Sequence, residues 1–145
     1  MDPRTFLTSD EQKDLEQSIA DAELKTSGEI RIHIEKNCED PFSRGKELFA
    51  QLKMHETAEK NGVLFYIAVV SRKFAILGDE GINSKVPPNF WDNIKNTMAT
   101  EFSQGRFLSG IKQGVLASGE QLASFFPHRE DDKNELSNTI SFGEQ

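Results

Sequence analysis

The sequence predicts an α/β protein: a three-layer α/β/α sandwich with about four helices and a small mixed central sheet of three to four strands. Residues 29–35, EIRIHIE, alternate without a fault between polar and apolar side chains, as in a strand with one buried face. Residues 62–77 hold two apolar runs separated by a short turn, which is the pattern of a hairpin. The first run is apolar on both faces, so we expect it in mid-sheet with helices above and below.

Length and composition are those of one domain. The 145 residues are 36% hydrophobic, and eleven Phe and one Trp supply much of the volume of a single core. We expect residues 1–127 to form this domain, because Pro127 is followed by a polar, charged stretch. Residues 128–145 are then a largely flexible tail, in which the alternation of residues 138–142 predicts a short edge strand.

Charge and cysteine content exclude several classes. The net charge is −7 with no basic stripe, so neither nucleic acid nor an anionic membrane face is an expected partner. No secretory signal and no apolar run near ~18 residues is present, so we expect no direct membrane insertion. The single cysteine, Cys38, cannot form an intrachain disulfide, which favours a cytoplasmic protein. We expect a monomer.

Caps and stops mark the expected helices. Thr8 and Glu11 have the spacing of a capping box, and that helix should end near Thr26. Asp40 followed by a proline begins a second helix, which runs toward Lys53. A third helix follows the paired prolines 87–88 and stops at Gly105. The last spans about 107–126, where Gly110 and Gly114, one turn apart, allow close packing on a neighbour.

Strand direction then brings acidic residues together. Residues 29–35 and the first hairpin strand should be parallel, joined by a helix, and the second hairpin strand antiparallel to both. The end of the hairpin therefore returns to the edge at which residues 29–35 begin. That edge gathers oxygen-bearing side chains, namely Glu29, Asp79, Glu80 and Asn83, with Asp92 joining if the third helix starts there; Glu56 and Glu59 arrive beside them.

A divalent cation suits such an edge. Ca²⁺ takes six to eight oxygen ligands at roughly 2.3–2.6 Å, and carboxylates, amides and main-chain carbonyls supply them. Without an ion the carboxylates would repel one another. The sequence therefore predicts a metal site formed by Glu29, Asp79, Glu80, Asn83 and Asp92, with Ca²⁺ as the expected ion and Mg²⁺ or Mn²⁺ as alternatives. The competing interpretation is a solvated turn at Asp79 and Glu80.

Other reactive side chains are explained more simply. Arg31 and His33 share a strand face with Glu29 and Glu35, which favours a same-face ion pair; a phosphatase would use Arg31 to hold phosphate and His33 as acid or base. His55 near a helix end is explained by a favourable dipole contact. The chain has no nucleophile elbow, no Walker motif and no dinucleotide motif. The sequence therefore predicts no catalytic residue.

Four segments of the chain resemble the TPM domain family, named for thylakoid-lumen, photosystem-repair and nematode membrane proteins. They are SGEIRIHIE (27–35), NGVLFYIAVVSRKFAILGDEGI (61–82), Phe90-Trp91-Asp92 and GRFLSGI (105–111), within a match over roughly residues 6–127. The resemblance implies an α/β/α sandwich around a small mixed sheet. It also implies divalent-cation binding, an acid-phosphatase activity known for some plant members, or an accessory role in assembling or repairing membrane complexes.

Together these observations predict a stand-alone TPM-like domain. We expect its acidic loops to bind a divalent cation in a structural or regulatory role, which changes the surface offered to an unknown protein partner. Two alternatives stay open. One is a metal-assisted acid phosphatase, and the other is a protein-interaction module that needs no metal.

Overall fold

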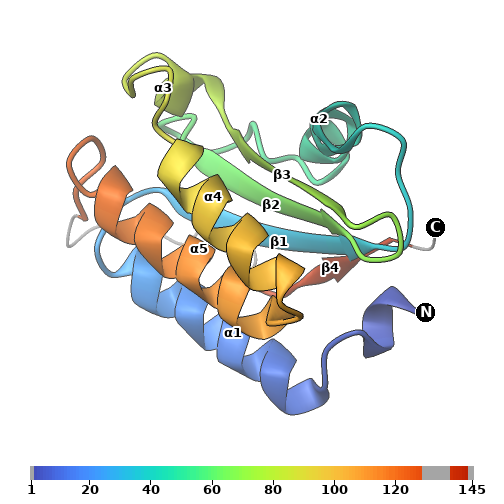
Figure 1. The fold of residues 1–145 in the computed structure, drawn as a ribbon. Helices are drawn as coiled ribbons and strands as arrows, with labels where there is room; N and C mark the ends of the chain where they lie inside the picture. Colours follow the sequence, from blue (N-terminus) through green and yellow to red (C-terminus); the bar gives the residue numbers. More distant parts are fainter. Residues whose placement is uncertain (1, 129–137, 144–145) are drawn as a thin grey trace.

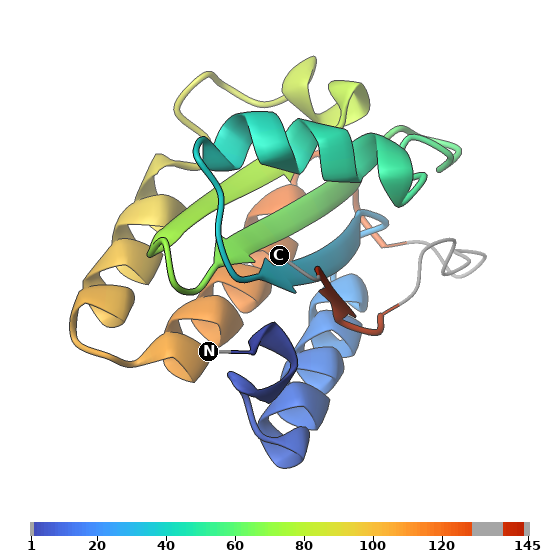
Figure 2. The ribbon, with the colours of Figure 1, turned by 90° about the vertical axis from the view of Figure 1, so that its right-hand side faces the viewer.

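A four-stranded mixed sheet lies between two helix layers in the computed structural model of the chain, which describes residues 2–128 and 138–143. Helices α1, α4 and α5 cover one face of the sheet and α2 covers the other (Figures 1 and 2). The elements in chain order are η1 (Pro3–Thr5), α1 (Ser9–Glu23), β1 (Glu29–Glu35), α2 (Pro41–Gln51), β2 (Gly62–Ala68), β3 (Lys73–Gly78), α3 (Glu80–Asn83), α4 (Asp92–Ser103), α5 (Phe107–Leu122) and β4 (Ser141–Phe142). The predicted α/β/α sandwich is confirmed.

The strand order is β3-β2-β1-β4. β1 and β2 are parallel, with Ile32 opposite Phe65, and β2 and β3 form the antiparallel hairpin, with Phe65 opposite Ile76. Every residue of β2 is buried, as expected for a strand covered on both faces. β4 adds to the outer side of β1 in parallel, within the range 138–142 where alternation predicts an edge strand. Much of the predicted flexible tail, residues 129–137 and 144–145, lies outside the described residues.

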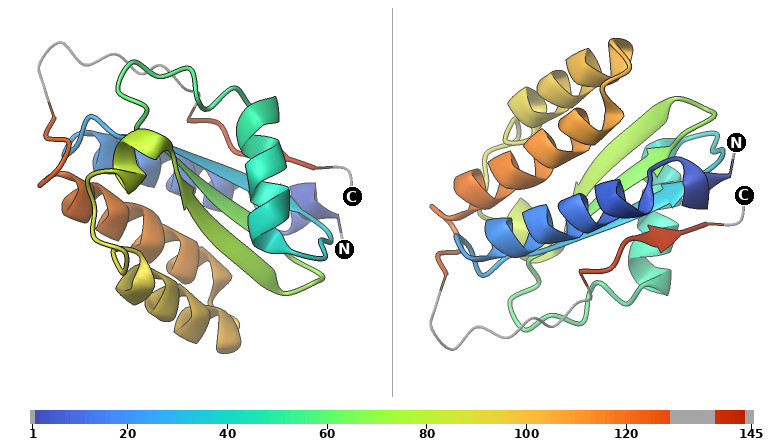
Figure 3. Two further views of the ribbon diagram at one scale, coloured as in Figure 1. Left: turned by 90° about the horizontal axis from the view of Figure 1, so that it is seen from above. Right: turned by 90° about the horizontal axis from the view of Figure 1, so that it is seen from below.

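The two faces of the sheet build two cores of unequal size. One face packs Ile30, Ile32 and Ile34 of β1, with Val63 and Phe65 of β2, against the layer of three helices. The other face packs alternate residues of β2 and β3 against the single helix α2: Leu64, Tyr66, Ala68, Ala75 and Leu77, with Leu48 and Phe49. Figure 3 shows α2 alone across its face of the sheet, with the three other long helices on the opposite side.

The polar face of β1 is more buried than the sequence predicts. The alternation predicts a strand with one buried face, but Glu29, His33 and Glu35 on its other face are also buried, and Arg31 is the one half-buried residue of the strand. Side chains from other elements cover this face of the strand. Arg44 of α2 reaches over Glu35, and Ser141 of β4 lies against His33.

Most helices begin and end close to the residues at which the sequence predicts caps. Thr8 and Glu11 form the predicted capping box, and Asp40 caps α2 with Pro41 at its first position. α1 ends at Glu23, three residues before the predicted end. The predicted loop after β3 is also different, because Asp79 caps the one-turn helix α3, whose Ile82 is fully buried.

Glycines let α5 approach its neighbours closely, as predicted for Gly110 and Gly114. A Cβ at Gly114 would lie 2.6 Å from Met98 Sδ, and one at Gly110 would lie 2.6 Å from a ring carbon of Phe102, both on α4. Among the glycines of α5, Gly119 lies closest to the backbone of another element. A Cβ at Gly119 would lie 2.8 Å from the carbonyl oxygen of Ala22, which belongs to α1.

We therefore expect Gly119→Ala to destabilise the domain by about 1–3 kcal/mol, measured by urea denaturation. Alanine in place of glycine favours a helix by about 1 kcal/mol, but the added methyl group meets backbone, which cannot rotate away. Glu120→Ala at the next position is the control, because it removes an exposed contact with Lys25 worth at most about 1 kcal/mol. A Gly119→Ala protein as stable as wild type would show that α1 and α5 can separate without cost.

Candidate functional site

A buried carboxylate stands at the end of the hairpin. Asp79 follows β3 directly and is 3% exposed. Its Oδ1 accepts a hydrogen bond of 2.8 Å from the Glu80 amide and lies 2.8 Å from His55 Nδ1. Because a carboxylate only accepts, the proton of this second bond is on Nδ1. Asp79 Oδ2 is buried and has no hydrogen-bond partner among the described residues.

His55 reaches Asp79 from the segment that follows α2. Its ring packs on Phe49, with 4.6 Å between the ring centroids, and its side chain is about half exposed. The helix-dipole contact predicted for this residue is therefore replaced by a hydrogen bond to a side chain 24 positions along the chain. Both printed hydrogen bonds of Asp79 therefore go to Oδ1, and Oδ2 has none with the residues that the structure describes.

A cavity of about 440 Å³ adjoins this carboxylate. Its charged residues are mixed, because Asp79, Glu80, Lys46 and Lys95 all line it. Phe42 and Trp91 form apolar parts of the wall. A volume in this range is typical of sites for small ligands.

Three of the five predicted ligands meet at this cavity. Asp79, Glu80 and Asn83 all line it. Glu29 does not, because β2 lies between β1 and β3 and two strand spacings separate Glu29 from Asp79 by roughly 9–10 Å. Asp92 is exposed at the start of α4 and does not line the cavity either, although its neighbour Trp91 does.

The side chains alone do not form a complete metal centre. In the part of the chain that the structure describes, no three His, Cys, Asp or Glu side chains are placed to hold one ion. The oxygen atoms available as metal ligands at the cavity belong to two carboxylates and to the side-chain amide of Asn83. The Nδ2 of that amide donates a hydrogen bond to the Gly78 carbonyl oxygen. Such an oxygen set suits a hard cation that keeps several of its waters, and it does not suit zinc or another ion that prefers nitrogen and sulfur.

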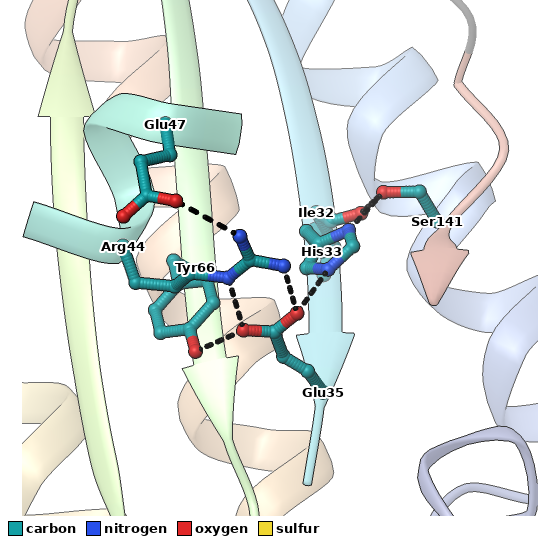
Figure 4. Close-up of polar contacts among 7 residues, drawn as sticks. All are labelled: Ile32, His33, Glu35, Arg44, Glu47, Tyr66 and Ser141. Carbon is teal, nitrogen blue, oxygen red and sulfur yellow. Dashed lines mark hydrogen bonds and ion pairs between the residues drawn. The ribbon is translucent and has the colours of Figure 1, made fainter. Parts of the chain in front are cut away.

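A second polar cluster lies under α2 (Figure 4). Glu35 is 1% exposed and accepts two hydrogen bonds from Arg44, 2.8 Å from Nε and 2.9 Å from Nη2. Tyr66 donates its hydroxyl proton to Glu35 Oε2 over 2.5 Å. His33 Nε2 lies 3.3 Å from Glu35 Oε1, and His33 Nδ1 lies 2.7 Å from Ser141 Oγ. The cluster thus ties α2, β1, β2 and β4 together.

Burial and hydrogen bonding set the charges of this cluster. Burial acts to raise the pKa of Glu35, but the hydrogen bonds from Arg44, Tyr66 and His33 together hold that pKa below its usual value. Burial lowers the pKa of His33, and burial with the adjacent carboxylate raises the pKa of Tyr66. At neutral pH the cluster is therefore an ionised Glu35–Arg44 pair with a neutral His33.

This geometry makes His33 a neutral hydrogen-bonding neighbour of Glu35 and does not favour the phosphatase interpretation. His33 is 4% exposed, and both ring nitrogens have partners inside the protein, so an external substrate has no access to them. Sequence reasoning missed Arg44 and Ser141, which are far from β1 in the chain or on another element. Tyr66 carried a signal, because a tyrosine in a wholly buried strand needs a partner for its hydroxyl group.

A mixed sheet with one helix on one face, three on the other and a cavity of mixed charge at the end of the hairpin defines a class of small α/β/α domains. The chain belongs to the TPM domain family, whose family model matches residues 1–121. No curated protein matches it. Within residues 2–128 and 138–143, no helix is both long and apolar enough to cross a membrane.

Solved structures agree with this assignment. The NMR structure of the BA42 protein from the psychrophilic bacterium Bizionia argentinensis is similar at 47% identity and a TM-score of 0.90, over 95% of this chain and 96% of that one. The N-terminal domain of a P. gingivalis protein matches at 19% identity and a TM-score of 0.67, over 86% and 82% of the two chains. The N-terminal domain of Corynebacterium glutamicum cg2496 matches at 14% identity and a TM-score of 0.62, over 97% of this chain and 82% of that one. At these low identities, the last two comparisons show that those domains share the fold of this chain.

We expect Arg44→Met to destabilise the domain by about 3–5 kcal/mol at pH 7, because it leaves the Glu35 carboxylate buried without its counter-charge. Tyr66→Phe should cost less, about 1–3 kcal/mol, since it removes one hydrogen bond. The matched control is Arg106→Met, which breaks an exposed pair with Glu101 and should cost at most about 1 kcal/mol. Urea denaturation measures all three.

The deficit of Arg44→Met should shrink as the pH falls from 7 toward 5. In the wild type the folded-state pKa of Glu35 lies below the unfolded value, so its stabilising effect is complete above that unfolded value and is lost only at lower pH. In the variant, burial raises the pKa of Glu35, and protonation then relieves the buried charge. A deficit that stayed constant with pH would contradict this assignment.

Proposed function

We propose that the cavity beside Asp79 binds a divalent cation, with Ca²⁺ as the preferred ion and Mg²⁺ or Mn²⁺ as weaker alternatives. The observation that carries the proposal is Asp79 Oδ2, a buried carboxylate oxygen without a hydrogen-bond partner among the described residues. An unsatisfied buried acceptor costs about 1–3 kcal/mol, and more when it is charged. A cation supplies the missing partner.

Asp79, Glu80 and Asn83 are the residues that would hold the ion, and water would complete its coordination. Ca²⁺ tolerates such an incomplete and flexible set better than Mg²⁺, which requires a near-ideal octahedron. Lys46 and Lys95 line the same cavity and oppose a cation. We therefore expect weak binding, with a Kd on the order of 10⁻⁴–10⁻³ M, in the range of sites with few charged ligands.

The role supported by this geometry is regulatory or structural. Asp79 Oδ2 is shielded from solvent, so an ion reaches it when the segment of residues 78–84 shifts. Trp91 packs near Gly78, where a Cβ would lie 3.4 Å from its ring, so the shift extends to the surface around α4. We propose that an unknown protein partner binds this surface.

Calcium titration tests the proposal in the whole chain. Amide NMR signals of residues 78–84 should shift together at millimolar Ca²⁺, and the fluorescence of Trp91, the single tryptophan, should change over the same range. Asp79→Asn should abolish both responses. Asp40→Asn is the matched control, because Asp40 also caps a helix and asparagine caps as well as aspartate.

Glu29→Gln and Asp92→Asn separate this site from the wider one that the sequence predicts. Both variants should bind Ca²⁺ as the wild type does, since neither residue lines the cavity. Titration without any shift in residues 78–84 at millimolar Ca²⁺ would reject the proposal and leave an interaction module that needs no metal.

Phosphate-ester hydrolysis is a second candidate, favoured by a different observation. Lys46 and Lys95 line the cavity that holds the hydrogen-bonded pair His55 and Asp79, so an anionic ester has cationic partners beside an imidazole. If the cavity is catalytic, hydrolysis of para-nitrophenyl phosphate at acid pH should need His55 and Asp79. Unchanged hydrolysis in His55→Gln and Asp79→Asn would exclude the cavity as a catalytic centre.

A further inference from the structure

A second cavity lies at the other end of the hairpin. It has a volume of about 520 Å³ and adjoins the first residues of β3, whereas the Asp79 cavity adjoins the last. Its walls come from the turn between β2 and β3, the turn between α4 and α5, and the segment after η1. Figure 2 shows these three parts at one end of the molecule. Neither the predicted metal site nor the TPM match accounts for this cavity.

Four phenylalanines form a continuous wall of this cavity. Phe6 contacts Phe107 edge to face at 5.1 Å between ring centroids, Phe107 stacks on Phe102 at 5.6 Å, and Phe102 contacts Phe74 at 5.1 Å. Three of these rings are half-buried, and Phe107 is 37% exposed. All four phenylalanines line the cavity, and such an accessible apolar wall favours an apolar ligand.

The charges at this cavity are of one sign. Arg72 and Lys73 are the charged residues among those that line it, and both are exposed. Lys73 Nζ donates to the carbonyl oxygen of Glu39 over 2.7 Å. Arg72 makes no hydrogen bond or ion pair with any residue that the structure describes, so its guanidinium group is available. On a protein with a net charge of −7, an apolar cavity with two cations at its rim is complementary to an anion with an apolar body.

We propose that this cavity binds a free monocarboxylate with an apolar tail, of the size of a medium-chain fatty acid. The tail packs on the phenylalanine wall. The planar guanidinium group of Arg72 donates two parallel hydrogen bonds to the carboxylate, and Lys73 is a second cation beside it. The site is separate from the Asp79 cavity and does not depend on the proposed cation.

Titration of the whole chain with decanoate, followed by amide NMR, tests this inference. Signals of residues 67–74 and 99–107 should shift together and saturate. Octanoate should bind about 15-fold more weakly than decanoate, because it lacks two methylene groups and each changes affinity roughly 4-fold. Decanol has the same tail without the charge, and it should also bind at least about 10-fold more weakly.

Variants separate the two parts of the site. Arg72→Gln should weaken decanoate binding about 10-fold without changing that of decanol, and Arg72→Lys should lie between it and the wild type. Lys25→Gln, which removes one exposed cation elsewhere, is the charge control. Ala99→Trp should block the cavity, because Ala99 lines it from an exposed position on α4 where a larger side chain leaves the core intact.

Three results would overturn the proposal. One is the absence of saturable shifts at these residues with about 1 mM decanoate, which corresponds to a Kd too weak for a specific site. Another is equal binding of decanol and decanoate together with an unchanged Arg72→Gln variant, which would make the cavity a neutral apolar site. The third is undiminished decanoate binding by a folded Ala99→Trp protein.

Discussion

The burial of β2 on both faces is the constraint from which the rest of the structure follows. All seven residues of this strand are buried, so each face of the sheet needs a helical cover. Three helices cover one face, and on the other α2 is the single long helix in the described part of the chain. The Glu35–Arg44 pair also ties α2 to β1. Phe42, Lys46 and Phe49 of α2 line the cavity beside Asp79.

The hairpin places the two candidate sites at opposite ends of one strand. β3 begins beside Arg72 of the apolar cavity and ends beside Asp79 of the other, so seven residue steps, about 23 Å of extended chain, separate these two charged residues. That distance is nearly three Debye lengths at physiological salt, so the charge of Arg72 has little effect on that of Asp79. Both sites use ends of elements that the core holds rigidly, which is where binding residues are commonly found.

Local pattern predicted the fold well because the deciding signals were local. The alternation of residues 29–35 matched β1 residue for residue, and Thr8 with Glu11 formed the capping box that their spacing indicates. The residues that line the cavity were predicted only in part, and the metal itself stays a prediction. Asp79, Glu80 and Asn83 are close in sequence and meet, whereas Glu29 depends on strand order and is separated by β2. Contacts such as His55 with Asp79 and Arg44 with Glu35 join different elements, and no periodicity encodes them.

The proposed cation site depends on one oxygen atom, Asp79 Oδ2, and a crystal structure with Ca²⁺ present tests it most directly. Anomalous scattering locates calcium independently of any assumption about its ligands. We expect an ion roughly 2.3–2.6 Å from Asp79 Oδ2, with oxygen from Glu80 or Asn83 and several waters completing its coordination. A water or a main-chain amide hydrogen-bonded to Oδ2, with calcium absent or bound only near Glu29 or Asp92, would contradict the account.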